Sequence, residues 1–303
     1  MKRKSESSVG LLYGLSAYLI WGSFPLIIAA ASFADPFEVV VWRVVFGFIF
    51  AALLVSIVGG WKEILQIVKS AQRLQWVAVA SLMIYINWVV YVVAVATGNV
   101  IESSLGYFIN PLVTVLFAVL LLKEKLRPMQ WVALSIGAVA VVVLTLDYGR
   151  LPFIAIALAV SFGIYSLAKN RVGKKIPALQ SFTIESGLVL PVALVQLWLV
   201  SQSAQIMLFS GFVETSILVG FGILTAIPLI LFGAAASRVP LSTIGFIQYL
   251  TPTIQFSIGF FVFGEPMPTV RWIGFALVWV SLAILTFDAL KRKRPDLPIV
   301  EQS

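Results

Sequence analysis

Ten stretches of about 20 predominantly apolar residues follow one another along the chain. A helix of about 20 residues spans the roughly 30 Å hydrocarbon core of a bilayer. Lipid also requires each segment to satisfy its own backbone, and the unbroken apolar runs lack the alternation of barrel strands. We therefore predict an all-α polytopic membrane protein with ten transmembrane helices, at residues 9–31, 37–58, 74–96, 101–122, 129–146, 151–168, 179–200, 213–236, 241–263 and 270–288.

Composition narrows the available chemistry. The 303 residues are 60% hydrophobic and 11% charged, which excludes a large soluble domain. The sequence contains neither His nor Cys, so disulfides and the usual metal ligands are missing and proton chemistry falls to carboxylates. Its 13 Asp and Glu residues are scattered and mostly single. We therefore expect no enzyme activity, no metal site and no cofactor.

The cations predict the orientation of the chain. Of the 21 Lys and Arg residues, only Arg150 and Arg271 fall opposite to the N-terminal side, while Arg43 falls inside a stretch. By the positive-inside rule both termini are cytoplasmic. The net charge of +8 thus belongs to short cytoplasmic loops and to a basic tail, residues 291–303, and we expect no nucleic-acid partner. The first stretch resembles a signal peptide, but its length and its internal counterpart predict a retained helix.

An offset of 141 residues superposes the two halves without a gap. The coincidences that carry weight are Pro111 with Pro252, Glu124 with Glu265, Trp131 with Trp272, and Asp147 with Asp288. Each half holds five stretches, an odd number, so the second half enters the membrane from the opposite side. We predict two inverted five-helix repeats, residues 1–146 and 151–290. Such repeats typically support alternating access, although a duplicated scaffold without transport is the alternative.

Two prolines interrupt apolar stretches at matching positions. Pro111 and Pro252 each remove a backbone donor and free the carbonyl four residues earlier, so we predict a kink at each. Polar backbone at this depth is tolerated only against protein or a water-filled cavity. We predict a central substrate cavity between helices 101–122 and 241–263, with a simple packing kink as the alternative. The residues that we expect to contact a small-molecule substrate are Trp21, Asn87, Trp88, Tyr107, Asn110, Gln248, Tyr249 and Thr251. Packing or interfacial anchoring explains most single Trp and Tyr residues equally well.

Charges inside the stretches are expected to be paired. Arg43 needs an anionic partner in lipid. Glu102, at the outer end of the fourth stretch, is better placed than Glu185 to be that partner. The inverted counterpart joins Glu185 to Arg238 at the inner side. These four residues are our candidates for gating or coupling, with Glu102 or Glu185 as a proton site. The alternative is that the charges only hold helices together and that Glu185 reaches the interface.

Several motifs resemble a known family, the RarD family of EamA-type permeases in the drug/metabolite transporter superfamily. These motifs are AYLIWG (17–22), Arg43, NW (87–88), ESSLGYFINPLV (102–113), MQW (129–131), IE (184–185), LP (190–191), LSTIGFIQYLTPT (241–253) and GE (264–265). The resemblance covers roughly residues 9–290. It implies a bacterial inner-membrane permease of ten helices, built from two EamA repeats around a central cavity, with an exporter role.

We predict a secondary transporter that exports small amphipathic metabolites or drugs by alternating access, with proton coupling as an open possibility. Its partners are a small-molecule substrate and membrane lipid, and the sequence leaves the oligomeric state open. The alternative is a non-transporting membrane receptor or assembly partner. The sequence contains no glycine-rich phosphate loop ending in Lys-Ser or Lys-Thr, so direct use of ATP would need another subunit.

Overall fold

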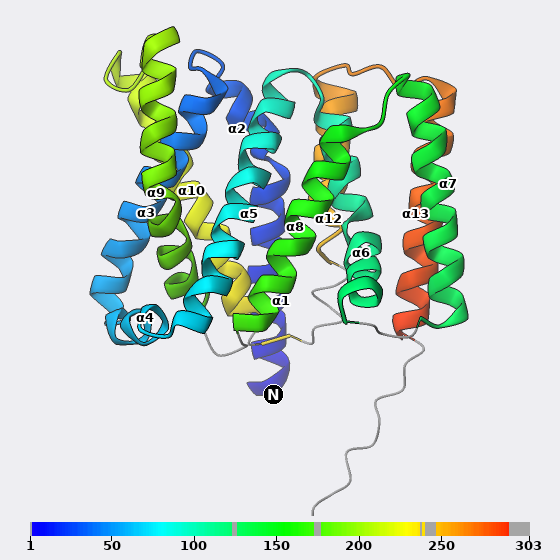
Figure 1. Cartoon of the computed structure of the whole chain (residues 1–303), viewed down its shortest axis with the longest axis horizontal. Coiled ribbons are helices and arrows are strands. Elements are labelled where there is room, and N and C mark those ends of the chain that lie inside the picture. Colours follow the sequence, from blue (N-terminus) through cyan, green and yellow to red (C-terminus); the bar gives the residue numbers. More distant parts are fainter. Residues whose placement is uncertain (1, 123–125, 173–176, 237, 240–246, 291–303) are drawn as a thin grey trace, which may run out of the picture.

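The computed structural model describes residues 2–122, 126–172, 177–236, 238–239 and 247–290 (Figure 1). Regular structure in these ranges is helical. In chain order the elements are α1 (Lys2–Gly22), α2 (Phe24–Ala30), α3 (Pro36–Val58), α4 (Trp61–Val68), α5 (Ala71–Ala96), α6 (Val100–Leu122), α7 (Pro128–Tyr148), α8 (Phe153–Val172), α9 (Ala178–Ser203), α10 (Phe212–Ala236), α12 (Leu250–Ser257), the π-helix η1 (Ile258–Val262) and α13 (Thr269–Leu290). The predicted basic tail, Glu124 and the start of the predicted helix 241–263 lie outside the described residues.

Length and composition mark the long helices as membrane spans. Within the described ranges, seven helices are long and apolar enough to cross a bilayer, namely α3, α5, α6, α7, α9, α10 and α13. If the bent pair of α1 and α2 is counted as one span, the number of candidate spans in these ranges rises to eight. The apolar part of α8, Phe153–Lys169, and the segment Leu250–Val262 are shorter. The chain is therefore a multi-pass membrane protein, and the count of ten spans stays a prediction.

The first predicted helix, residues 9–31, is broken in two. α1 starts already at Lys2 and ends at Gly22, and α2 follows Ser23 at an angle of 41°. Pro25 lies at the start of α2, where the first amides of a helix have no intrahelical partner. The Ser23 side chain donates a hydrogen bond to the carbonyl of Leu19 at 2.9 Å, which satisfies part of the end of α1. The prediction of a single helix was wrong here because it ignored Pro25.

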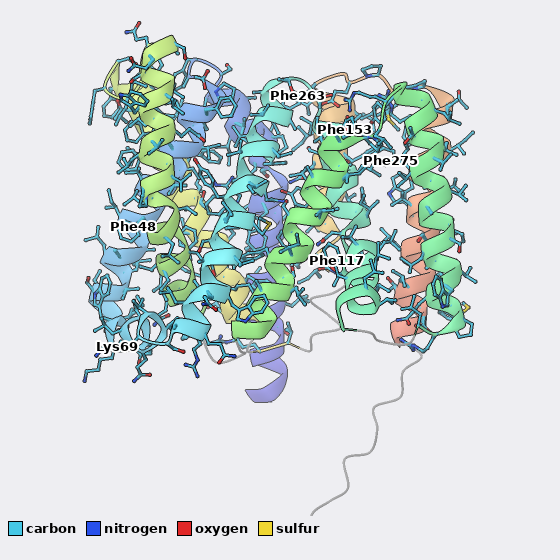
Figure 2. All side chains as sticks on the ribbon, in the orientation of Figure 1. Phe48, Lys69, Phe117, Phe153, Phe263 and Phe275 are labelled. Atoms are coloured by element: carbon cyan, nitrogen blue, oxygen red, sulfur yellow. The ribbon has the colours of Figure 1, made fainter. Side chains whose placement is uncertain are left out.

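A short amphipathic helix, α4, connects α3 to α5 and was not predicted. Ile64 and Ile67 are buried in a small cluster with residues of α3, α5 and α9. Trp61 and Leu65 on the other face are exposed. α4 lies at the lower left corner of the bundle, at the end where the N-terminus emerges (Figure 1). Lys69, which follows α4, lies at this same end (Figure 2).

The long helices pack in a set of pairs. α7 lies beside α13 at one side of the molecule (Figure 1), and α3 packs on α9. α5 packs on α8, α1 on α10, α6 on α8, and α1 on α12. Most buried apolar residues belong to two clusters, one among α2, α3, α5, α9 and α10 and the other among α6, α7 and α13. The charged residues considered below lie within or beside the first cluster, or at the ends of the helices.

The prolines of the two predicted kinks occupy different settings. Pro111 lies inside α6, which continues from Val100 to Leu122. Pro252 is the third residue of α12, so it lies in a first turn, where its missing amide leaves no bond unmade. Residues 240–246 lie outside the described ranges, and the chain turns at Gln248 and Tyr249 directly before α12, so the kink at Pro252 stays a prediction. Two further prolines lie inside helices, Pro191 in α9, which belongs to the LP motif at 190–191, and Pro228 in α10, which was not singled out from the sequence.

Candidate functional site

Two charged residues occupy matching positions on two neighbouring helices. α3 begins directly after Asp35, whose carboxylate accepts a hydrogen bond from the Phe37 amide at 2.8 Å. α9 begins directly after Pro177. These fixed starts make Arg43 the eighth residue of α3 and Glu185 the eighth residue of α9. Both side chains are buried, at 4% and 3% exposure.

Arg43 is enclosed by aromatic rings. Its guanidinium carbon lies 4.4 Å from the ring centroid of Trp88, 5.2 Å from that of Phe24 and 5.3 Å from that of Phe221. The predicted ion pair with Glu102 is not formed, because Glu102 lies at the start of α6 and binds Arg150. The charge of Arg43 thus meets π-electrons instead of a carboxylate.

The rings leave the guanidinium of Arg43 without hydrogen bonds. Each cation–π contact at a desolvated site contributes about 2 kcal/mol. The rings offer no carbonyl or carboxylate oxygen, however, and a buried donor without a partner costs about 1–3 kcal/mol. Among the described residues, Arg43 Nε and Nη1 are fully covered and have no acceptor. Arg43 therefore has unused capacity to bind an anion.

Asn87, Trp88 and Tyr107 are brought together beside Arg43, as the sequence predicted for a substrate-contacting group. The Asn87 amide donates to the Leu158 carbonyl and to Ser161 Oγ, both at 3.0 Å. Asn87 Oδ1 accepts from the Tyr107 hydroxyl at 3.1 Å. Asn87 thus joins α5 to α6 and α8, and its hydrogen bonds have a structural role. Its contact with substrate stays a prediction.

Three buried polar atoms in the described part of the chain make no hydrogen bond of ordinary geometry, namely the Tyr91 hydroxyl, Asn110 Oδ1 and Gln255 Oε1. The Tyr91 hydroxyl and the Gln255 side chain nevertheless lie within reach of each other. The Tyr91 ring lies 5.7 Å from the Tyr107 ring, and both hydroxyls are in electrostatic range of Arg43. Buried polar atoms are seldom left unpaired unless water or a ligand reaches them.

Other predicted contact residues lie elsewhere. Trp21 packs edge-on against Tyr18, and its carbonyl accepts from Gln255 Nε2 at 3.3 Å. Thr251 Oγ1 donates to the Tyr18 carbonyl at 2.9 Å, which ties α12 to α1. Tyr249 packs on the cluster of α6, α7 and α13. Gln248 is exposed. Thr251, Tyr249 and Gln248 therefore do not converge on the Arg43 group, whereas Trp21 packs on the apolar cluster that contains Trp88 and Phe24.

Glu185 is fully engaged. Its carboxylate forms an ion pair with Lys169 of α8 at 2.6 Å and accepts hydrogen bonds from Ser181 at 2.7 Å and Tyr165 at 3.2 Å. Lys169 also donates to Ser181 Oγ. The predicted pairing of Glu185 with Arg238 is corrected to this cluster, which we call the Glu185 network. The Arg238 guanidinium donates to the Ala234 carbonyl at 2.9 Å and lies 5.7 Å from the Tyr13 ring.

Carboxylates also organise the end of the molecule where α6 and α8 begin. Glu102 forms an ion pair with Arg150 at 2.8 Å and accepts a hydrogen bond from the Ile154 amide at 3.0 Å. The hydrogen bonds to Glu102 raise the pKa of Arg150. Glu265 accepts the Val100 and Ile101 amides at 2.6 and 2.9 Å, so it caps α6. Burial raises the pKa of Glu265 above its usual 4.5, against the opposing effect of these amides.

An apolar groove of about 340 Å³ lies between α2 and α10. Its lining residues are Leu26, Ile27, Ala30, Ser216, Ile217, Gly220, Phe221 and Leu224. Phe221 also faces Arg43, so this ring separates the groove from the guanidinium. The groove is not the predicted cavity between α6 and α12, which stays a prediction. In the described ranges, no three Asp or Glu side chains gather closely enough to hold a metal ion.

Sequence reasoning missed the partners that the structure gives to these charges. Lys169 and Arg150 were assigned to loops, where a cation signals orientation and not pairing. The role of Lys169 was predictable in part. Ser181 and Glu185 are spaced i, i+4, and so are Tyr165 and Lys169. Residues at this spacing share a helix face. Phe24 and Phe221 carry no comparable signal, since they are two of 22 phenylalanines in the chain.

Comparisons with known proteins identify the family. A sequence profile of the EamA-like transporter family matches residues 8–146. The chain is 41% identical over 295 residues to Protein RarD of Streptomyces exfoliatus, covering 97% of this chain and 93% of that protein. It is 35% identical over 290 residues to Protein RarD of Escherichia coli (strain K12), covering 95% and 97%.

Further matches agree. The chain is 36% identical over 303 residues to the uncharacterized transporter YojE of Bacillus subtilis (strain 168), covering 96% of this chain and 97% of that protein. A crystal structure with 22% sequence identity has the same fold, at a TM-score of 0.60 over 93% of this chain and 99% of that chain. The chain therefore belongs to the RarD family of EamA-type permeases, which makes it a membrane transporter and not an enzyme.

Proposed function

We propose that the protein is a secondary transporter that exports small amphipathic metabolites or drugs by alternating access between two inverted repeats, residues 1–146 and 151–290. The observation that carries this proposal is the pattern of helix packing. If α1, α3, α5, α6 and α7 correspond to α8, α9, α10, α12 and α13, the contact of α5 with α8 mirrors that of α1 with α10. Likewise α6 with α8 mirrors α1 with α12. Matching contacts are expected when two halves can exchange their conformations.

The ends of α7 and α13 support the same correspondence. Asp147 at the end of α7 pairs with Arg271 at the start of α13, at 2.7 Å. Asp288 near the end of α13 pairs with Arg127 at the start of α7, at 2.8 Å. Asp147 and Asp288 are separated by the repeat offset of 141 residues. The two arginines are separated by 144 residues, close to that offset, so the two ion pairs support an inverted repeat.

We place the protein in the bacterial inner membrane with both termini in the cytoplasm. α4 and Lys69 lie at the end of the bundle where the N-terminus emerges (Figure 2). An amphipathic helix with flanking cations suits the cytoplasmic surface of a bilayer. Arg150 and Arg271 then fall on the outer side, where each is paired with an acid.

For coupling and gating we propose one carboxylate at each side. Glu102 with Arg150 serves the outer side, and Glu185 with Lys169 serves the inner side. Glu185 is the better proton site, because its cluster joins α8 to α9 within the bundle and contains a hydroxyl donor on each helix. Arg43 and Arg238 remain in the proposed set, Arg43 through the role argued below.

The test is counterflow in proteoliposomes. Proteoliposomes that contain the purified protein are loaded with aromatic amino acids or amphenicols, and exchange of the labelled compound is measured at two imposed pH gradients. The proteins compared are wild type, Glu185→Gln and Glu63→Gln. Glu63 is an exposed carboxylate on α4 and serves as the matched control. We expect flux that responds to the gradient in wild type and Glu63→Gln, and flux without that response in Glu185→Gln.

Each other outcome removes a defined part of the proposal. Flux that ignores the gradient in wild type removes proton coupling but keeps transport. Unchanged gradient dependence in Glu185→Gln moves the proton site to another carboxylate. Absence of flux from folded protein contradicts this substrate class and favours the alternative, a non-transporting receptor or assembly partner.

A further inference from the structure

We propose that Arg43 forms the anion-binding half of a ligand site, and that its ligand is a small aromatic carboxylate. The inference rests on the transport function proposed above and names the substrate class of that site. It starts from a contrast in charge. The described carboxylates Glu102, Asp147, Glu185 and Asp288 each have a cationic partner. Arg43 has no acid and no hydrogen-bond acceptor in the described part of the chain.

The guanidinium can still donate. Nε and Nη1 are fully covered and lack acceptors in the described part of the chain, so both donors are available to a ligand. The planar guanidinium binds a carboxylate through two parallel hydrogen bonds, which a neutral group cannot match. One uncompensated positive charge calls for one negative charge, so a monocarboxylate fits better than a dianion.

The surroundings favour an aromatic ligand. Trp88, Phe24 and Phe221 surround the guanidinium at 4.4 to 5.3 Å, and Tyr91 and Tyr107 lie in electrostatic range. Aromatic rings pack well on one another in edge-on or offset geometry. The Tyr91 hydroxyl and Gln255 Oε1 are covered polar atoms that make no hydrogen bond of ordinary geometry, although they lie within reach of each other, and they can bind polar groups on the ligand. The site thus offers one charge, several rings and a few polar atoms, as ligand pockets typically do.

The inference is tested with two probes of the same shape, 3-phenylpropionate and its neutral amide 3-phenylpropanamide. Binding to detergent-purified full-length protein is measured by titration calorimetry and by quenching of tryptophan fluorescence, to which Trp88 contributes. The variants are Arg43→Gln, Arg43→Lys and Arg73→Gln. Arg73 is an exposed arginine at the start of α5 and serves as the control. Size-exclusion chromatography and thermal unfolding report folding of each variant.

We expect wild type and Arg73→Gln to bind the carboxylate at least about tenfold more tightly than the amide. Arg43→Gln should lose this preference, and Arg43→Lys should keep part of it because the charge remains without the planar fork. Equal affinities for the two probes in wild type would overturn the proposal, as would an intact preference in Arg43→Gln. Failure of wild type to bind the carboxylate would overturn it as well.

Binding and counterflow separate the two proposals. Carboxylate binding that depends on Arg43, without any flux, would support the site and contradict the transport proposal. Flux of neutral amphenicols without a carboxylate preference would support transport and contradict the site. The comparison of acid with amide in wild type needs no substitution, so it decides the question even if Arg43→Gln does not fold.

Discussion

Arg43 on α3 and Glu185 on α9 occupy the same position of two neighbouring helices, yet their surroundings differ in kind. Glu185 has an ammonium group and two hydroxyl donors within hydrogen-bond distance. Arg43 has three aromatic rings and no acceptor among the described residues. Equal burial therefore does not imply that the polar groups are equally well satisfied. The Glu185 network is complete within the chain, whereas the Arg43 site is completed only by a molecule from outside.

The largest expected effect follows from breaking the complete network. Lys169→Met leaves Glu185 buried without its cation, and removing one partner of a buried pair costs about 3–5 kcal/mol. Because the Lys169 side chain is partly exposed, we expect the free energy of unfolding to fall by about 3 kcal/mol, the lower end of this range. Thermal unfolding in detergent should show a clearly lower midpoint than wild type.

Arg43→Met is the matched experiment on the incomplete site. It removes a buried cation that has no counter-ion, so we expect the midpoint to be unchanged or raised in the absence of ligand. A midpoint as low as that of Lys169→Met would contradict the distinction between the two sites. It would indicate that the three rings satisfy Arg43 as fully as Lys169 satisfies Glu185.

A second buried carboxylate, Glu38 on α3, tests whether hydrogen bonds can stabilise a buried carboxylate that has no cationic partner among the described residues. Glu38 is fully buried, and its Oε1 accepts from Trp42 Nε1 at 2.9 Å and from the amides of Met207 at 2.8 Å and Leu208 at 3.1 Å. Glu38→Ala leaves these donors unpaired and should lower the free energy of unfolding by about 2 kcal/mol. Glu38→Gln keeps one acceptor oxygen and should lose less than about 1 kcal/mol. Chemical unfolding of both variants measures the difference, and equal losses would argue against hydrogen bonding as the cause.

The two ion pairs between α7 and α13 should contribute differently to stability, because their side chains differ in exposure. Arg271 and Asp147 side chains are 15% and 7% exposed, whereas Arg127 and Asp288 are 43% and 12% exposed. We expect Asp147→Asn to lower stability by about 1–2 kcal/mol and Asp288→Asn by less than about 1 kcal/mol. High salt should weaken the Arg127 pair more than the Arg271 pair. The reverse order in unfolding experiments would contradict this assignment.

The smallest effect concerns pH and Glu265. Burial raises the pKa of this carboxyl, so the folded chain holds the proton more tightly than the unfolded chain. The resulting stability is present below the unfolded pKa and is lost as pH rises through the raised, folded pKa. Wild type should therefore lose stability relative to Glu265→Gln as the pH is raised above about 4.5. A constant difference across this range would show that the amides of α6 offset the burial of Glu265.

Sequence patterns anticipated much of the fold because lipid imposes long apolar segments. The helical, multi-pass architecture of the described residues and the approximate positions of α3, α5, α6, α7, α9, α10 and α13 followed from this constraint. The break at Ser23 and the helix α4 were missed because each depends on one local feature, Pro25 and a two-sided run of eight residues. Averaging over a 20-residue window hides such features.

The site was less predictable, for a different reason. Asn87, Trp88 and Tyr107 were predicted to contact substrate, which stays a prediction, and the structure shows that Asn87 and Tyr107 are hydrogen-bonded to each other. The partners of Arg43 and Glu102 were wrong because helix depth alone does not specify which faces meet. Glu102 finds Arg150 through the turn between α7 and α8, and Arg43 finds rings from α2, α5 and α10. Such contacts depend on rotation about each helix axis, which an apolar stretch does not encode.

The paired ends of α7 and α13 also restrict how the molecule can move. An ion pair at each end fixes the two helices against sliding along their axes, because a shift by one turn would separate both pairs. Ser281 adds a third tie in between, where its hydroxyl donates to the Ala133 carbonyl. The α7–α13 pair is therefore held against sliding at three points, and we expect any movement of the other helices to leave this pair intact.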